Sequence, residues 1–236
     1  MSSCIGHQLV ELLKVLLDPN PLDAEKASVA ATAGLNSVLD HLYRAHMDKL
    51  TTALVRPPGP RDPLVIHSGK YHALELLSFF VSKHGSRIKT FSLKHNLLQK
   101  VSQLIPVSGR ELQLSAIRFL RVCVGMKDDQ LIWRIVSGKL LDPVVAVFVK
   151  NGSRYNMVNS AFIEMVEFIR KENLKDLVDY LAVDHMTKFD RVKYVSTFQQ
   201  LKLRYDQNQE FRTANGVFSD SDRGEEGEAQ RFVCTS

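Results

Sequence analysis

The segment Leu140–Asn173, LLDPVVAVFVKNGSRYNMVNSAFIEMVEFIRKEN, decides the fold that we expect for this chain. Its first part contains the continuous apolar run Val144–Val149, which predicts a buried helix. Asn151-Gly152-Ser153 then predicts a turn, because glycine readily adopts the positive φ that ends a helix. The segment therefore predicts a helical hairpin.

The second half of this hairpin has the spacing of an amphipathic helix. Its apolar residues recur at i, i+3, i+4 and i+7, and they are Val158, Ala161, Phe162, Met165, Phe168 and Ile169. On the polar face, Glu167 and Lys171 stand four residues apart, a spacing that favours an ion pair. Neither helix buries its apolar face alone, so further helices must pack beside the hairpin.

A repeat of 43 to 45 residues supplies these neighbours. Ala73-Leu74, Ala116-Ile117 and Ala161-Phe162 follow one another at spacings of 43 and 45 residues, and Leu97-Leu98 and Leu140-Leu141 lie 43 apart. Armadillo and HEAT repeats have periods of about 40–47 residues. We therefore expect an all-α, armadillo/HEAT-like α-solenoid of stacked helical hairpins, with two to three helices per repeat. A globular helix bundle is the alternative.

The other helices are predicted from apolar spacing and from proline-rich breaks, since proline does not continue a helix. They are Cys4–Leu17, Asp23–Val55, Lys70–His84, Lys94–Ile105, Arg110–Gly125, Asp128–Val136, Leu174–Leu181 and Tyr194–Tyr205. An armadillo-like helical domain is thus expected over residues 1–205, with a proline-rich loop at about 56–63. Residues 206–236 are expected to be a disordered polar and acidic tail, because they have too little apolar surface to offset the entropy of ordering.

Composition and charge limit the class of protein. The 236 residues are 44% hydrophobic and 24% charged, as in folded soluble proteins, and no apolar run approaches the roughly 18 residues of a membrane span. Three widely spaced cysteines and the absence of a signal-peptide pattern predict a reduced protein of the nucleus or cytoplasm. Residues 1–205 carry a net charge of +9, whereas residues 206–236 hold seven acidic and three basic side chains. A basic body leaves nucleic acid open as a partner, although the scattered lysines and arginines also fit solvated helix faces.

Catalytic and cofactor motifs are missing from the sequence. The phosphate-binding patterns G-x-x-x-x-G-K-[ST] and G-x-G-x-x-G do not occur, and neither does G-x-S-x-G. His41 and His46, like His67 and His72, are five residues apart and so point away from each other on a helix; we expect surface or half-buried histidines. Cys123 is expected in the core, and Trp133 in the core or as an anchor between repeats. No catalytic residue, cofactor or metal is predicted, which favours a binding scaffold over an enzyme.

Several blocks resemble the regulatory subunit 3 family of serine/threonine-protein phosphatase 4, also called the Smek family. The blocks are Phe119–Arg121, Gly125–Asp128, Lys139–Val145, Asn151–Ala161, Glu167–Arg170 and Tyr194–Lys202. The resemblance covers roughly residues 10–205 and implies the family's central armadillo-like domain. The family's N-terminal pleckstrin-homology-like domain has no counterpart in this sequence, which leaves a fragment, a short isoform or a divergent paralogue open.

The resemblance implies a non-catalytic regulatory or scaffold subunit of a phosphatase 4 complex. Its expected partners are the catalytic subunit, the second regulatory subunit and phosphoprotein substrates, and its expected location is the nucleus and cytoplasm, with a link to DNA repair. A general protein scaffold or a basic nucleic-acid-binding repeat outside the complex is the alternative. Arg154, Tyr155, Asn156 and Asn159 are the candidate partner contacts, although the asparagines also suit a structural role as helix caps.

The acidic tail carries two candidate modification sites. Ser219 and Ser221 each precede an acidic residue, which is the context of an acid-directed kinase. Phosphorylation would add negative charge there, and we expect the tail then to compete for the basic body.

Overall fold

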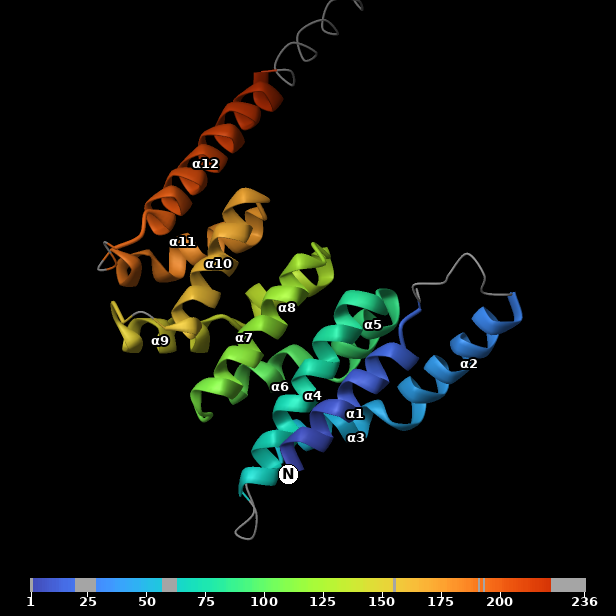
Figure 1. Ribbon diagram of the computed structural model, residues 1–236. Coiled ribbons are helices and arrows are strands. Elements are labelled where there is room, and N and C mark those ends of the chain that lie inside the picture. The colour runs from blue at the N-terminus through green and yellow to red at the C-terminus, as the bar shows by residue number, and fades with distance from the viewer. Residues whose placement is uncertain are drawn as a thin grey trace, which may run out of the picture. The chain divides into compact units, whose positions relative to one another are not determined.

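A computed structural model describes residues 2–19, 29–56, 63–154, 156–190, 192 and 194–221. These residues form helices and no strands (Figure 1). The helices are α1 Ser2–Leu16, α2 Val29–Ala45, α3 Met47–Val55, α4 Pro63–Lys83, α5 Ser86–Lys94, α6 Leu97–Leu104, α7 Arg110–Gly125, α8 Asp129–Ser137, α9 Asp142–Asn151, α10 Met157–Lys171, α11 Lys175–Phe189 and α12 Thr197–Ser221. The all-α fold class is confirmed.

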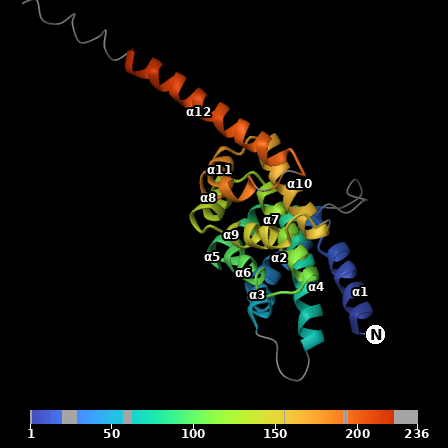
Figure 2. The same cartoon turned by 90° about the vertical axis from the view of Figure 1, so that its left-hand side faces the viewer.

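The chain divides into two compact units, Met1–Met165 and Val166–Ser236, and the division falls inside α10. In the first unit, helices that occupy the same position in successive repeats pack side by side (Figures 1 and 2). The stacks are α3–α6–α9, α5–α8 and α1–α4–α7. We call the last one the third-helix row, because α4, α7 and α10 each end a group of three helices. The chain is therefore a helical repeat, with three helices per repeat.

The core of the first unit lies where the repeat predicts it. All three small-plus-large pairs, which begin at Ala73, Ala116 and Ala161, are buried, and so are the leucine pairs that begin at Leu97 and Leu140. Helix α7 alone buries Leu112, Ala116, Ile117, Phe119, Leu120, Cys123 and Val124. The apolar face predicted for each repeat is thus the face that packs against its neighbours.

One helix expected in the N-terminal half is divided into two in the structure. The single helix expected over Asp23–Val55 is two helices, because the chain turns at His46 (φ −121°, ψ −27°) and α3 then buries Met47, Thr51 and Leu54. Residues 20–28 lie outside the described residues, and so do residues 57–62 of the proline-rich loop.

Helix α5 was not expected from the sequence. It covers only nine residues, and its one apolar face consists of the buried Ile88 and Phe91. Such a short segment, with its remaining residues mostly polar, gives little helical periodicity.

The second unit contains a longer last helix than the sequence predicts. Helix α12 continues past Tyr205, where the apolar spacing ends, up to Ser221. Two polar contacts hold this extension of α12 beside α11. Asn208 Nδ2 donates to Oδ1 of Asn173, just before α11, at 2.9 Å, and Arg212 pairs with Asp179 of α11 at 2.7 Å. Residues 222–236 lie outside the described residues, so their disorder stays a prediction.

One prediction about side-chain burial is wrong. Trp133 is 63% exposed, because α8 turns Leu131, Ile132 and Ile135 inward and its tryptophan outward. The histidines of the two predicted pairs are exposed or half-buried, as expected, whereas His84 and His185 are buried. Cys123 is buried as expected, and burial raises the pKa of its thiol. Within the described ranges, no helix combines the length and the apolar character needed to cross a membrane.

Candidate functional site

The turn between α9 and α10 carries the residues that the sequence singles out as partner contacts. Gly152 ends α9 with φ +63°, a backbone conformation that strains side-chain-bearing residues. Arg154 is exposed, whereas Tyr155 lies outside the described residues. The turn therefore presents the side chain of Arg154 to solvent.

Asn156 begins α10 as an N-cap. Its Oδ1 accepts a hydrogen bond from the backbone N–H of Asn159 at 2.8 Å, which satisfies one of the free donors at the helix start. Its Nδ2 donates to the carbonyl of Arg154 at 3.1 Å. Both polar ends of this side chain are thus bonded within the turn.

Asn159 is buried and closes the hairpin from inside. Its Nδ2 donates to the carbonyls of Gly152 at 3.0 Å and Arg154 at 3.1 Å, and its Oδ1 accepts from Asn151 Nδ2 at 3.0 Å. The two asparagines therefore have a structural role in the turn. Of the described candidate contacts, Arg154 is the one whose side chain is free to reach a partner.

The third-helix row contains hollows beside α1, α4 and α7. One of about 660 Å³ is lined by His7, His67, Ser68, Tyr71, His72, Glu111, Leu114, Ser115 and Arg118. Another of about 370 Å³ is lined by Lys14, Tyr71, Leu74, Glu75, Ser78, Phe79, Ser82, Ser115, Arg118 and Val122. Aromatic and polar side chains thus share this surface, as at protein-binding sites.

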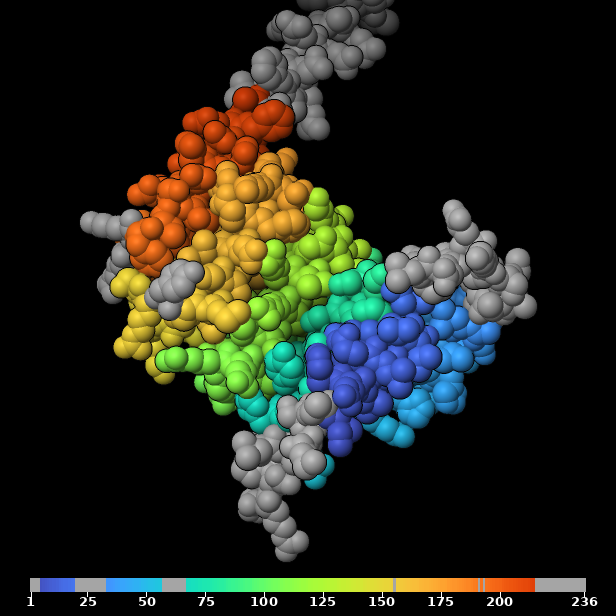
Figure 3. Space-filling model, viewed as in Figure 1, coloured from blue at the N-terminus to red at the C-terminus, as the bar shows by residue number. Residues whose placement is uncertain are grey.

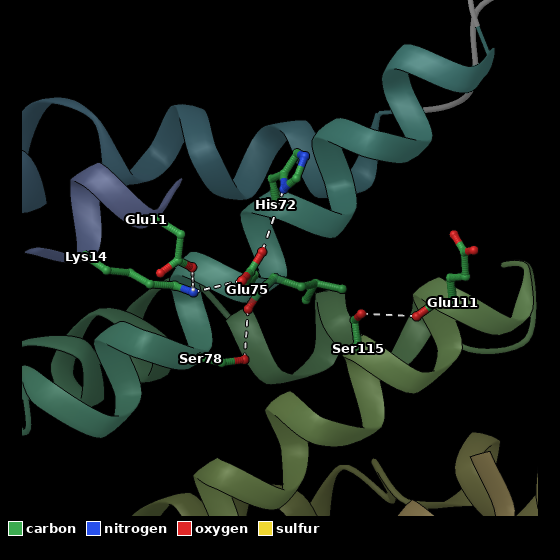
Figure 4. A network of polar contacts seen from close by, with 8 residues as sticks. Glu11, Lys14, His72, Glu75, Ser78, Glu111 and Ser115 are labelled. Carbon is green, nitrogen blue, oxygen red and sulfur yellow. Dashed lines mark hydrogen bonds and ion pairs between the residues drawn. The ribbon is translucent and has the colours of Figure 1, made fainter. Parts of the chain in front are cut away.

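Two serines of this surface, Ser78 and Ser115, donate hydrogen bonds to carbonyls of their own helices. Ser78 Oγ donates to the carbonyl of Leu74 at 2.8 Å, and Ser115 Oγ donates to that of Glu111 at 3.0 Å (Figure 4). Both hydroxyl groups are therefore held by the backbone of the helix that carries them.

A lysine bridges two carboxylates where α1 meets α4. Lys14 Nζ lies 2.7 Å from Glu11 Oε1 and 2.7 Å from Glu75 Oε1 (Figure 4). The hydrogen bond from Lys14 lowers the pKa of Glu11. Burial opposes the charge on Lys14, but its bonds to the two carboxylates outweigh burial and raise its pKa. Among the described residues, His7, Glu11 and Glu75 form the one group of three possible metal ligands.

This cluster was not predicted from the sequence. His7 and Glu11 stand at i, i+4 on α1, whereas the histidine pairs considered above are five residues apart. That spacing was the signal for two ligands on one helix face. Glu75 could not have been added, because only the fold brings α4 beside α1.

An ion pair joins exposed side chains of α7 and α10. Arg121 Nη1 lies 2.5 Å from Glu164 Oε2, with the arginine 40% and the glutamate 60% exposed. The two residues are 43 positions apart, one repeat period. An ion pair therefore joins equivalent positions of two successive repeats.

Comparison with known sequences assigns the chain to a family. The family model described as phosphatase 4 regulatory subunit 3 matches residues 2–207. This chain belongs to the phosphatase 4 regulatory subunit 3 family. The sequence blocks that suggested the resemblance lie inside the matched range.

Relatives of this chain come from different organisms. It is 32% identical over 212 residues to the Serine/threonine-protein phosphatase 4 regulatory subunit 3 of Drosophila melanogaster, a match to 87% of this chain and 20% of the fly protein. It is 31% identical over 216 residues to Suppressor of Mek1 of Dictyostelium discoideum, a match to 86% and 20% of the two chains. Protein PPP4R3C1 of Mus musculus is 40% identical over 134 residues, covering 57% and 16%.

The chain spans about a fifth of the length of these relatives or less. No solved structure matches it. The family match therefore covers most of this chain but only a small part of each of these relatives.

Proposed function

We propose that this chain is a non-catalytic regulatory or scaffold subunit of a serine/threonine-protein phosphatase 4 complex. The observation that carries the proposal is the family match over residues 2–207, which includes α1 to α11 and the first eleven residues of α12. The printed name of the fly relative describes a regulatory subunit. Helical repeats present extended surfaces to partners, which suits such a role.

The proposed partners are the catalytic subunit, the second regulatory subunit and phosphoprotein substrates. We propose that the catalytic chemistry belongs to the catalytic subunit and that this chain acts in the nucleus and cytoplasm, with DNA repair among its roles. The family membership alone supports these proposed partners, this location and this role.

Two surfaces of the first unit are proposed to contact partners. One is the turn around Arg154, and the other is the part of the third-helix row around Arg118. Both arginines are exposed, and arginine is enriched at protein interfaces because its planar head makes several hydrogen bonds at once. Asn156 and Asn159 are proposed to support the first surface by fixing the backbone of Arg154.

The test is co-elution of this chain with the phosphatase 4 catalytic subunit on a sizing column, with and without the second regulatory subunit. We expect a complex with the native chain and weaker binding for Arg154→Glu or Arg118→Glu. Matched controls are Lys150→Glu on α9 and Arg110→Glu at the start of α7, which make the same charge change at other exposed positions. Separate elution of the native chain under both conditions would refute the proposal. Equal binding by all four variants would refute the proposed surfaces.

A further inference from the structure

Two helices bring three metal-binding side chains together at the start of the third-helix row. His7 and Glu11 stand four residues apart on α1, so both side chains project from one helix face, and Glu75 comes from α4. One nitrogen or oxygen atom of each residue lies within 4.8 Å of those of the other two. Figure 4 shows Glu11 and Glu75 pointing toward each other from the two helices.

These three side chains form a donor set that suits a first-row divalent metal ion. Imidazole nitrogen and carboxylate oxygen are both ligands of Zn²⁺, with bonds of about 2.0–2.2 Å. Ligand atoms at the corners of a tetrahedron of that size lie about 3.4 Å apart. The ligand atoms must therefore approach by at most about 1.4 Å, which small side-chain rotations provide.

One carboxylate oxygen of the cluster also lacks a hydrogen bond. Glu75 Oε2 is buried and makes no hydrogen bond to any described residue, although it lies 3.7 Å from His72 Nδ1. Both ring nitrogens of His72 are likewise buried without a hydrogen bond. A buried carboxylate oxygen left without a partner is costly, and coordination to a cation would remove that cost.

Close contact between the two helices keeps this arrangement in place. A Cβ atom at Gly6 would lie 2.7 Å from His72 Nε2, so the imidazole of His72 packs directly against α1 at this glycine. A larger residue at position 6 would require the His72 side chain beside Glu75 to move.

We propose that His7, Glu11 and Glu75 bind a divalent transition-metal ion such as Zn²⁺ in competition with the ammonium group of Lys14. Lys14 bridges the two carboxylates at 2.7 Å each, so it supplies the positive charge when no metal is bound. The metal replaces it and adds the imidazole of His7 as a third ligand. Because the ligands come from two helices, the bound ion ties α1 to α4 and stabilises the folded chain.

The test is a calorimetric titration of the full chain with Zn²⁺ after treatment with a chelator. We expect saturable binding of one ion, weakened at least about tenfold by His7→Ala or Glu11→Gln, since even the loss of a supporting residue weakens metal sites by about 10–100-fold. Lys14→Met is expected to bind Zn²⁺ more tightly, because the competing charge is gone. Zn²⁺ should also raise the melting temperature of the native chain but not that of His7→Ala.

Controls separate this site from other sources of Zn²⁺ binding. His41→Ala removes an exposed histidine of α2 that lies beside His46, and Cys4→Ser with Cys234→Ser removes the two thiols other than buried Cys123, because thiols bind Zn²⁺ on their own. Both variants are expected to bind as the native chain does.

The proposal is refuted by an absence of saturable binding, by native affinity in His7→Ala, or by loss of binding in the histidine or cysteine controls. Unchanged or weaker binding by Lys14→Met also refutes it, and general misfolding cannot imitate a gain in affinity. The outcome is independent of co-elution with the phosphatase.

Discussion

Helix α4 meets two neighbours in the third-helix row, and the two contacts differ in chemistry. On one side, α7 is buried through seven apolar side chains, among them Phe119. On the other, Val10 is the buried apolar side chain of α1 among those described, and Lys14 bridges to Glu75. Five other large apolar side chains of α1 are exposed, namely Ile5, Leu9, Leu12, Val15 and Leu16, whereas Leu13 is half-buried. Figure 3 shows that α1 lies at the surface of the first unit.

The difference in chemistry predicts a difference in stability. Buried apolar surface contributes about 25 cal/mol per Å², so α4 and α7 should unfold together. A partly exposed ion pair contributes roughly 0–1 kcal/mol. Helix α1 should therefore open locally at a lower free energy than the α4–α7 pair.

The largest effect is expected from Phe119→Ala in α7. Phe119 is fully buried, and removal of such a side chain costs about 3–5 kcal/mol of unfolding free energy because it leaves a cavity. The matched change Leu9→Ala in α1 removes a side chain that is 54% exposed and should cost less than about 1 kcal/mol. Urea denaturation measures both. Equal losses would show that the two contacts do not differ as described.

A smaller effect is expected from Val10→Ala. The change removes two buried methyl groups, which is worth about 1.6 kcal/mol at about 0.8 kcal/mol for each. Val10 stabilises the packing of α1 and not that of α7. Amide hydrogen exchange should therefore become faster in α1 and stay unchanged in α7. Faster exchange in both helices would mean that α1 and α7 unfold as one unit.

Acid should weaken the end of α1 further. His84 Nε2 lies 2.9 Å from the carbonyl of Leu17, and its Nδ1 lies 2.9 Å from the hydroxyl of Tyr43. Burial lowers the pKa of His84, nearby Arg87 lowers it too, and the Leu17 carbonyl and Asp18 oppose them without reversing the direction. The folded state thus binds this proton less readily than the unfolded chain does.

Stability from His84 should therefore be complete above its unfolded pKa of about 6.5 and should decline as the pH falls below it. The slope from one proton cannot exceed about 1.4 kcal/mol per pH unit. Urea midpoints at pH 7.5 and pH 5 measure it in the native chain and in His84→Gln, which does not titrate there. An equal decline in both chains would assign the acid sensitivity to other groups.

The apolar parts of this molecule could be predicted from the sequence, and the polar parts could not. Leu74, Ile117 and Phe162 were placed in the core correctly because apolar periodicity states which face is buried. Trp133 has the same apolar character but lies on the outer face of a short helix. Periodicity over nine residues is too brief to separate the two faces.

The candidate sites show the same limit. Asn159 was selected from its sequence block, but only the structure shows that its amide closes the turn through Gly152, Arg154 and Asn151. The pairing of Lys14 with Glu75 joins positions 61 residues apart. No local pattern specifies which helices become neighbours, so contacts between distant polar residues need the fold first.

The smallest effect on stability is expected from the ion pair between α7 and α10. Arg121 and Glu164 link α7 to α10 at 2.5 Å, but both are substantially exposed, and water screens their attraction. A double-mutant cycle with Arg121→Ala and Glu164→Ala should give a coupling of about 0.2–1 kcal/mol, which should shrink in 1 M salt. A coupling above about 2 kcal/mol, or one that salt leaves unchanged, would mean that this pair fixes α10 onto α7. Polar contacts would then be as important between these repeats as they are between α1 and α4.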